Sequence, residues 1–429
     1  MHKSLIIISF SLCVFSVSSQ QSSLLEKYRS MAVSYNHDLK AADKNISASI
    51  ELERSARADL KPKLSGSADF QYTGNPLQLT LNLPSMDKPM TFEGRDLKYG
   101  ASLTLLQPVY TGGRILETIR LAKHQQSLAT HQEELFRSAV CYQTDIQYWN
   151  TVARAEIVEV ATEYRNSIAS LAQTIRERVE VGLVDPQDQL MAEVKLNEAD
   201  YQLLQAKSNF ETGRMALNSL IGMELHTATE IDTVIPPVVI PGEIRQSDAT
   251  DRPELKIAYD QIRIAETSLK LSDSKYKPQL YIGVDGSYSS PGYDFRGDLD
   301  PNYVVYAKLS VPLFEWGKRK DEKRAFSYRI GMAKDNLNQV SDHVTLEVQT
   351  ARVSLSQALE RVGLTGSSLE KARENEQKAL ERYTEGKVSV VEVIEAQTYR
   401  QTSQLNYVQA KVSAQGYYSE LIKALNKYL

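Results

Sequence analysis

The sequence predicts a mainly helical fold made of two copies of one unit, with a β-hairpin between the helices of each copy. Residues 114–181 span 68 positions without Gly or Pro, which as one helix would be about 100 Å long. Four short segments alternate apolar and polar residues with the period of a strand. Short matching stretches recur at a fixed offset, so each unit is expected to read helix, strand, strand, long helix, helix.

The first residues are predicted to be a signal peptide. Lys3 precedes an apolar stretch at residues 5–17, and Ser18 and Ser19 stand before Gln20. This arrangement is typical of a secretory signal, which we place at residues 1–19 with cleavage near Gln20.

The two cysteines support export without a lipid anchor. Cys13 follows Leu12, where a lipoprotein signal has a small residue, and it lies inside the apolar stretch. Lipidation is therefore not expected. After cleavage only Cys141 remains, which excludes an intrachain disulfide.

The repeat shows as two series of matches. Lys61-Pro62 recurs 216 positions later, whereas Gln205-Ala206-Lys207 recurs 204 positions later as Gln409-Ala410-Lys411. The difference of 12 places a longer loop in the first copy, between Pro62 and Pro108. We expect a first repeat at 20–222, an inter-repeat connection at 223–251 and a second repeat at 252–429.

The helices of both copies carry coiled-coil spacing. Apolar residues after the first long helix recur at alternating steps of three and four, with large and small side chains mixed; they are Leu196, Ala199, Leu203, Ala206, Phe210, Gly213, Leu217 and Leu220. In the second copy, Gly363 and Gly366 predict a break or bend in the long helix.

Two hairpins are expected at about 64–107 and 280–311. Leu64, Phe70 and Tyr72 alternate with polar residues, as do Val284 and Val305 in the second copy. Each strand therefore has one apolar and one polar face. This pattern fits a half-buried sheet in a soluble protein as well as a membrane strand.

Four strands do not close a barrel, because even small barrels need about eight. Three chains that pooled their hairpins would supply twelve, an even number within the range of outer-membrane barrels, with apolar faces toward lipid and polar faces toward the lumen. Aromatic residues near the strand ends fit an interfacial girdle; they are Tyr72, Tyr99, Tyr110, Tyr281, Tyr288, Tyr303, Phe314 and Trp316.

With these features the chain resembles the TolC-like outer membrane efflux family. The resemblance covers the repeat, the Arg252-Pro253-Glu254-Leu255 opening of the second copy and two helix-turn-helix tips. The first tip, residues 178–184, matches the family's Arg-x-x-Val-Gly-Leu-Val pattern. The second, residues 383–386, matches Tyr-x-x-Gly and is followed by a stretch similar to Val-Asp-Val-Leu-Asp-Ala at 391–396.

The resemblance implies a homotrimeric export channel in the outer membrane that extends into the periplasm. It implies a twelve-stranded β-barrel, a trimeric α-helical barrel and an equatorial region at 223–251. A periplasmic adaptor and an inner-membrane pump would dock at the tips and supply small molecules or proteins for export. The tip residues implied are Arg178, Val181, Gly182, Leu183 and Gly386. Both glycines also fit a simple turn that ends a helix.

The resemblance also implies a gate. Glu392 and Glu395 align with the family's acidic constriction residues, with Glu in place of Asp, and their spacing of three puts them on one helix face. Six carboxylates in a narrow entrance would attract cations and respond to pH or divalent ions.

The family's closed entrance is tied by an Asp, a Tyr and an Arg. Asp188 and Tyr383 match the first two, whereas Val388 occupies the Arg position. Lys387 stands next to it and is a candidate substitute for the cation. The closed state is therefore expected to be held differently in this chain.

Composition and motifs argue against other functions. The net charge of −4 does not favour a nucleic-acid partner. The usual hydrolase, metalloprotease and nucleotide-binding motifs are absent, so neither an enzyme nor a cofactor is expected. His124 and His131 are seven apart and are more simply an exposed pair than a metal site.

One alternative function remains from the sequence. A soluble periplasmic coiled-coil adaptor or scaffold would also be exported and helical, with its hairpins in an ordinary sheet. The paired amphipathic strands favour the channel. The exported compound, the pump class and the adaptor are not encoded in recognisable motifs.

Overall fold

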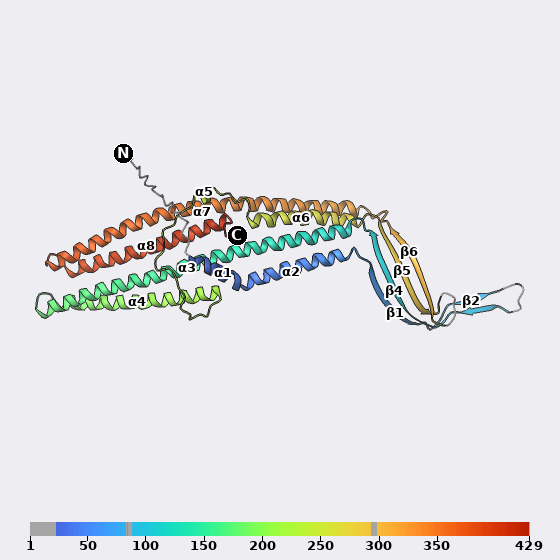
Figure 1. The fold of residues 1–429 in the computed structure, drawn as a ribbon, viewed down its shortest axis with the longest axis horizontal. Coiled ribbons are helices and arrows are strands. Elements are labelled where there is room, and N and C mark those ends of the chain that lie inside the picture. The colour runs from blue at the N-terminus through green and yellow to red at the C-terminus, as the bar shows by residue number, and fades with distance from the viewer. Residues whose placement is uncertain (1–22, 83, 85–87, 293–297, 429) are drawn as a thin grey trace, which may run out of the picture. The chain divides into compact units, whose positions relative to one another are not determined.

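The computed structural model describes residues 23–82, 84, 88–292 and 298–428, so the predicted signal peptide and Cys13 lie outside the described residues. Each repeat reads as expected, with an additional hairpin in the first and a short helix before the second (Figure 1). The first contains α1 (Ser23–Tyr35), α2 (His37–Ala58), β1 (Lys63–Tyr72), β2 (Gln78–Leu81), β3 (Met90–Glu93), β4 (Leu97–Tyr110), α3 (Arg114–Glu180) and α4 (Pro186–Ile221). The short helix α5 (Gly242–Gln246) lies in the inter-repeat connection, and the second repeat contains α6 (Pro253–Ser274), β5 (Gln279–Ser290), β6 (Asp300–Ser310), α7 (Lys318–Thr384) and α8 (Val390–Ala424).

The chain forms two compact units, and α3 and α7 contribute to both. One unit contains the chain up to Ala41, Glu133–Pro253 and the residues from Ser341 onward. The other contains Ala42–Gln132 and Glu254–Val340, including all the strands. None of the helices in the described ranges combines the length and the apolar character needed to cross a bilayer.

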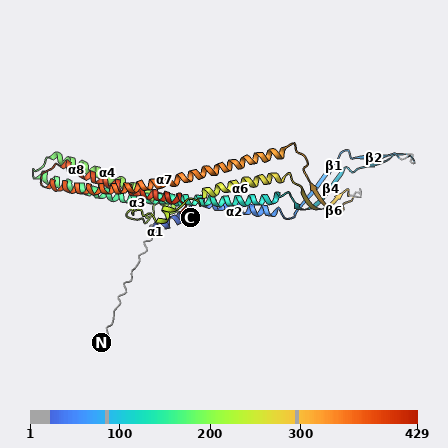
Figure 2. The ribbon, with the colours of Figure 1, turned by 90° about the horizontal axis from the view of Figure 1, so that it is seen from above.

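Small residues let α4 lie close to α3. Ala192, Ala199, Ala206 and Gly213 are seven apart and all buried. A Cβ atom at Gly213 would come within 2.8 Å of the Arg154 side chain, so a larger residue there would displace that arginine. Of the predicted core positions, Ala199, Ala206, Gly213 and Leu217 are buried, whereas the other large ones are half-buried. Helix α4 returns beside α3 as α8 does beside α7 (Figures 1 and 2).

The prediction of a break in the second long helix is wrong. α7 runs for 67 residues, the same length as α3, and passes through Gly363 and Gly366. A glycine lowers helix stability by only about 1 kcal/mol relative to Ala, which the packing of the neighbouring turns can offset. At Gly366 a Cβ atom would lie 3.3 Å from the Tyr407 ring of α8, so the glycine makes room for that ring.

Four of the strands form an antiparallel sheet in the order β1-β4-β5-β6, which joins the hairpins of the two repeats. The register aligns the apolar residues of all four strands: Leu64 pairs with Leu105, Leu105 with Val284, and Val284 with Val305. The opposite face carries the row Ser67, Ser102, Ser287 and Asn302. The sheet therefore has one apolar and one polar face, as the alternation predicts.

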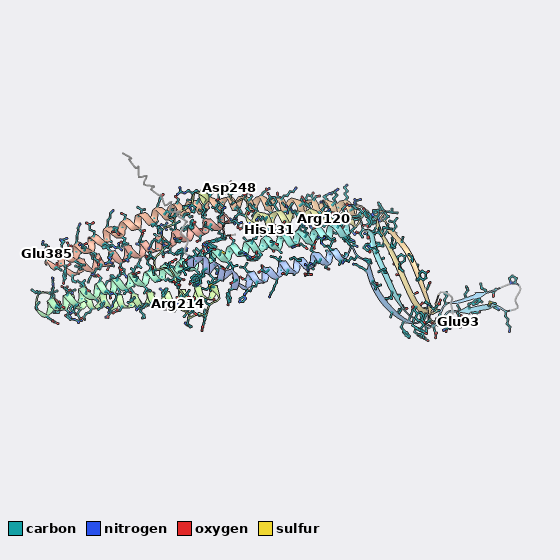
Figure 3. All side chains as sticks on the ribbon, viewed as in Figure 1. Glu93, Arg120, His131, Arg214, Asp248 and Glu385 are labelled. Atoms are coloured by element: carbon teal, nitrogen blue, oxygen red, sulfur yellow. The ribbon has the colours of Figure 1, made fainter. Side chains whose placement is uncertain are left out.

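The longer loop of the first copy contains structure that the sequence analysis missed. Strands β2 and β3 form a second, two-stranded sheet (Figure 1). Leu79 pairs with Phe92 and Leu81 with Met90, whereas Gln78 pairs with Glu93, which Figure 3 labels. The alternation of Leu with polar residues at 77–81 was the available signal.

Candidate functional site

The two predicted tips end their long helices with the same turn. At the first tip, the Gly182 N–H donates to the Val179 carbonyl at 2.9 Å and the Leu183 N–H donates to the Arg178 carbonyl at 2.8 Å. Gly182 has φ +74°, and a Cβ atom there would meet nothing within 4 Å. The pair of bonds is a Schellman motif, so glycine is needed for its left-handed backbone and not for space.

The second tip repeats this geometry. The Gly386 N–H donates to the Tyr383 carbonyl at 3.0 Å, and the Lys387 N–H donates to the Arg382 carbonyl at 2.9 Å. Gly386 has φ +72° and open space around its Cα atom. The interpretation of both glycines as helix-ending turn residues is confirmed.

The helices that follow the tips begin with side-chain caps. The Asp185 carboxylate accepts from the Gln187 N–H at 2.8 Å, and Pro186 opens α4. In the second copy the Glu392 carboxylate accepts from the Ser389 N–H at 3.4 Å. Glu392 thus has a structural role at the start of α8, because an acidic side chain there satisfies a free N–H and complements the helix dipole.

Arg178 connects the first tip to the second. Its guanidinium donates to the carbonyls of Tyr383 and Thr384, each at 3.2 Å, and lies 4.8 Å from the centre of the Tyr383 ring. These carbonyls lie at the negative end of the α7 dipole, where a cation is favourable. Arg178 therefore holds the end of α7 to the end of α3.

Tyr383 belongs to an apolar cluster below this contact. The cluster contains Leu171, Ala172, Ile175, Ala192, Val390 and Val393, with Val388 packed against it. Burial raises the pKa of the Tyr383 phenol, and the charge of Asp188 raises it further. Among the described residues the Tyr383 hydroxyl has no hydrogen-bond partner.

The expected closing link takes a different form here. Asp188 lies near Tyr383 but accepts no hydrogen bond from its hydroxyl among the described residues. Lys387 forms an ion pair with Glu385 at 2.6 Å, both well exposed, so within the chain it does not supply the cation. Arg178, which the resemblance assigned to docking, is the cation that contacts Tyr383.

The side chains of the acidic pair, Glu392 and Glu395, are exposed in the single chain. Glu392 and Glu395 both lie on the outer surface of α8. Glu395 borders an apolar groove of about 390 Å³ between α4 and α8. Other groove residues are Leu190, Met191, Val194, Val391 and Ile394. A ring of these carboxylates requires further copies of the chain, so the constriction stays a prediction.

The tip surfaces differ in chemistry. Val181 and Leu183 are exposed at the first tip, with 68% and 75% of their surface accessible. The second tip presents the Glu385–Lys387 ion pair instead, with Glu385 labelled at the turn in Figure 3. Two exposed apolar side chains beside a rigid turn suit a protein contact better than bulk water.

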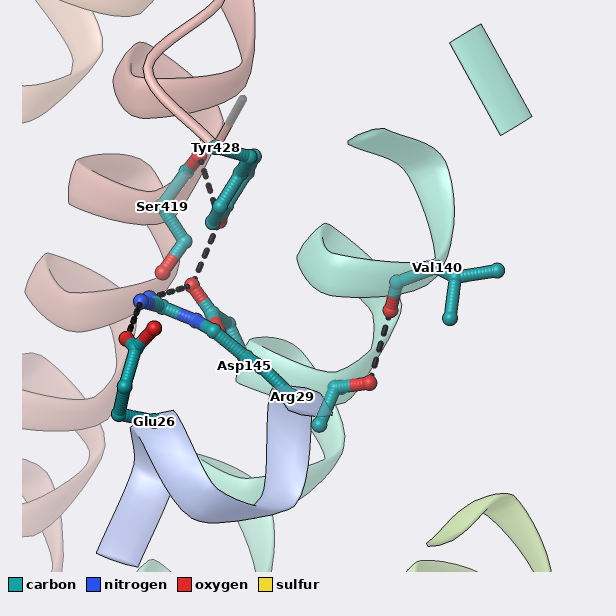
Figure 4. A network of polar contacts seen from close by, with 7 residues as sticks. Glu26, Arg29, Val140, Asp145, Ser419 and Tyr428 are labelled. Atoms are coloured by element: carbon teal, nitrogen blue, oxygen red, sulfur yellow. Dashed lines mark hydrogen bonds and ion pairs between the residues drawn. The ribbon is translucent and has the colours of Figure 1, made fainter. Parts of the chain in front are cut away.

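Farther along the same unit, a buried polar cluster joins the two ends of the chain to α3 (Figure 4). The Arg29 guanidinium donates two bonds to the Asp145 carboxylate, from Nε at 2.6 Å and Nη2 at 2.7 Å. The Tyr428 hydroxyl donates to Asp145 at 2.5 Å. Burial and then the Asp145 charge raise the pKa of Tyr428. The sequence analysis missed this cluster, because its members are 116 and 283 residues apart.

The histidine pair and Cys141 do not form a chemical site within the described ranges. His131 is partly buried and its Nδ1 lies 2.7 Å from the Asp260 carboxylate, so the prediction of an exposed pair is wrong. Burial lowers the pKa of His124 and raises that of Cys141 to about 11. Within the described ranges, no group of three or more His, Cys, Asp or Glu is placed to hold a metal.

Comparison with known proteins identifies the family. The sequence profile of the outer membrane efflux proteins matches residues 29–223 and 245–427. The solvent efflux pump outer membrane protein SrpC of Pseudomonas putida is 24% identical in an alignment of 302 residues that covers 67% of this chain and 60% of SrpC. The match thus spans less than two thirds of that relative's length.

Solved structures agree on the fold. The Campylobacter jejuni CmeC outer membrane channel aligns over 99% of this chain and 93% of its own, with a TM-score of 0.75 and 18% identity. The Vibrio cholerae outer membrane protein VceC aligns over 94% of this chain and 96% of its own, with a TM-score of 0.76 and 15% identity. The profile match confirms the resemblance and the outer-membrane location, and these folds confirm the helical two-fold repeat. This chain belongs to the outer membrane efflux protein family.

Proposed function

We propose that the chain is the outer-membrane channel of a tripartite efflux system, working as a homotrimer. The observation that carries this proposal is the uncovered apolar face of the sheet. Phe70 is 74% exposed, Tyr303 76% and Val305 65%, and the register places all three on the same face. Such a face is costly in water and favourable in lipid.

The two free edges of the sheet support closure by further copies. Within the described strands, β1 and β6 each pair on one side only. Because the sheet has an even number of antiparallel strands, β1 and β6 run in opposite directions. In a closed assembly, β6 of one copy would therefore run antiparallel to β1 of the next. Three copies give a closed barrel of twelve strands, which leaves no unpaired edge. The polar row from Ser67 to Asn302 would then line the lumen.

Cargo and partners follow from the tips and the relatives. SrpC and the toluene efflux pump protein TtgI are named for solvent and toluene efflux, which supports small organic molecules as cargo. An inner-membrane pump would supply the energy, and a periplasmic adaptor would dock at the tips. Val181 and Leu183 offer the adaptor an apolar contact, Gly182 and Gly386 fix the turns, and Arg178 keeps the two tips together.

The gate is proposed at Glu392 and Glu395. Both carboxylates are exposed on one face of α8 near the second tip, as a constriction between copies requires. Asp188 and Tyr383 would contribute as the neighbouring closing residues. Three copies would bring six acidic side chains together, and the concentrated negative charge of the ring would attract cations.

Single-channel recording in planar bilayers tests this proposal. The purified protein is expected to give stepwise conductance with a cation preference and block by divalent ions. Glu392→Gln with Glu395→Gln is expected to lower both the preference and the block several-fold, because the ring loses its charge. Glu374→Gln, on an exposed turn of α7 away from the tip, is the matched control.

The two parts of the proposal fail separately. Absence of conductance from correctly folded protein contradicts the channel. Conductance with selectivity unchanged by the double substitution contradicts only the gate assignment.

A further inference from the structure

The segment between β6 and α7 differs from its counterpart in the first repeat. At the offset of 204, Trp316 occupies the position of Gly112. Both have left-handed backbones, with φ +65° at Gly112 and +48° at Trp316. A bulky side chain rarely adopts this conformation because its Cβ atom crowds the backbone. The second repeat therefore holds a Trp where the turn itself favours Gly.

Trp316 is not held at this turn by burial of its side chain. In the first repeat a Cβ atom at Gly112 would come within 2.6 Å of the Ser274 carbonyl, so that turn is closely covered. Trp316 is instead 90% exposed, beside Leu313 at 91% and Phe314 at 71%. The Trp316 and Phe314 rings meet edge to face with centroids 4.9 Å apart. Three large apolar side chains thus project together from one turn.

A run of cations follows this group. Lys318, Arg319 and Lys320 form the first turn of α7, whereas the first turn of α3 reads Arg114-Ile115-Leu116. Cations at a helix N-terminus oppose the helix dipole. Arg319 pairs with Asp273 at 2.8 Å, while Lys318 and Lys320 are exposed. The acids in this turn, Asp321 and Glu322, are fewer than the cations, and Glu322 accepts a bond from Ser272.

The geometry points to a binding surface for anionic phospholipid headgroups, formed by Leu313, Phe314, Trp316, Lys318 and Lys320. This inference rests on the proposed function, which places the end of β6 nearest the helices at the periplasmic leaflet of the outer membrane. Trp and its apolar neighbours would enter the interface, where aromatic side chains are favoured. The lysines would contact lipid phosphates, which attract basic residues beside an interface. Membrane contact would then offset both the strained backbone and the unfavourable charges.

The two tryptophans of the chain allow a direct test by fluorescence. Trp149 is buried at 3% exposure, so it serves as an internal control. The Trp149→Phe variant reports Trp316 alone, and the Trp316→Phe variant reports Trp149 alone. Both are reconstituted into vesicles that contain brominated phosphatidylglycerol or brominated phosphatidylcholine, and iodide is added as a quencher from water.

We expect brominated lipid to quench Trp316 at least several-fold more than Trp149, and brominated phosphatidylglycerol to quench more than brominated phosphatidylcholine. In Lys318→Gln with Lys320→Gln, the two brominated lipids are expected to quench equally. Quenching of Trp316 by iodide alone, or by neither agent, overturns the inference, the latter by showing that protein covers the residue. If both brominated lipids quench Trp316 equally while Lys318 and Lys320 are intact, the proposed recognition of anionic headgroups by these lysines is overturned.

Flotation of the same vesicles separates this inference from the proposed function. Protein that floats with the vesicles and conducts, but whose Trp316 is not quenched by lipid, overturns the headgroup surface alone. Protein that does not enter the vesicles overturns both.

Discussion

Two arginines in the same unit each hold two segments together, yet their surroundings differ. Arg29 is 10% exposed and binds both oxygens of a fully buried carboxylate, and Tyr428 donates to Oδ2 of the same carboxylate. Arg178 lies at the tip, is partly exposed, and binds two main-chain carbonyls and an aromatic ring. The first contact joins charges that cannot be separated without leaving one buried alone. The second joins a cation to neutral groups that water can replace.

The Arg29 contact is therefore a permanent joint between two segments, and the Arg178 contact is a releasable joint. A buried pair that loses a partner is strongly destabilised, so the Arg29 cluster is suited to fixing α1 and the chain's end on α3. A hydrogen bond to a carbonyl contributes only about 0.5–1.5 kcal/mol net. The Arg178 contact is therefore suited to a tip that moves, as the proposed docking of an adaptor requires.

The largest expected effect comes from Asp145. Asp145→Ala removes the buried carboxylate that Arg29 and Tyr428 share and should lower the free energy of unfolding by about 3–5 kcal/mol. Chemical unfolding of the detergent-solubilised protein measures this loss. Glu26→Gln removes the exposed partner of the same arginine and should cost no more than about 1 kcal/mol. Equal effects of the two substitutions would show that burial does not distinguish the joint.

A smaller effect on stability, but a clear one on gating, is expected at Arg178. Arg178→Ala removes the carbonyl bonds and the ring contact and should cost about 1–2 kcal/mol. In bilayers without adaptor, its open probability should rise, because the end of α7 is no longer held to α3. Arg176→Ala, which removes a surface ion pair of 3.4 Å two residues away, is the control. An open probability unchanged from the unsubstituted protein would refute the releasable joint.

Patterns that repeat locally were predictable, and contacts between distant segments were not. The alternation in Leu64–Tyr72 fixed which residues share a face, because a period of two allows only one apolar side. The seven-residue spacing from Ala199 to Gly213 likewise indicated which face of α4 packs in a coiled-coil manner. By contrast, nothing near Arg29 indicates Asp145, since their pairing depends on how helices pack.

The candidate site was predicted in position but not in its contacts. Gly182 and Gly386 were recognisable as turns, whereas the altered closing link expected from Val388 stays a prediction. The contact of Arg178 with Tyr383 was not foreseen, because Arg178 lies in the other repeat, 205 residues away. The break expected at Gly363 failed for a related reason: tertiary packing outweighs the low helix propensity of single glycines.

The central claim, that three copies close their sheets edge to edge, is tested most directly by photo-crosslinking at a strand edge. Benzoylphenylalanine in place of Ala307, on edge strand β6, should yield products of two and three chains and nothing larger. The same group in place of Ala101, on the inner strand β4, should crosslink mainly within its own chain. Monomer alone from the Ala307 variant, or a ladder that continues beyond three, would contradict the closed trimer.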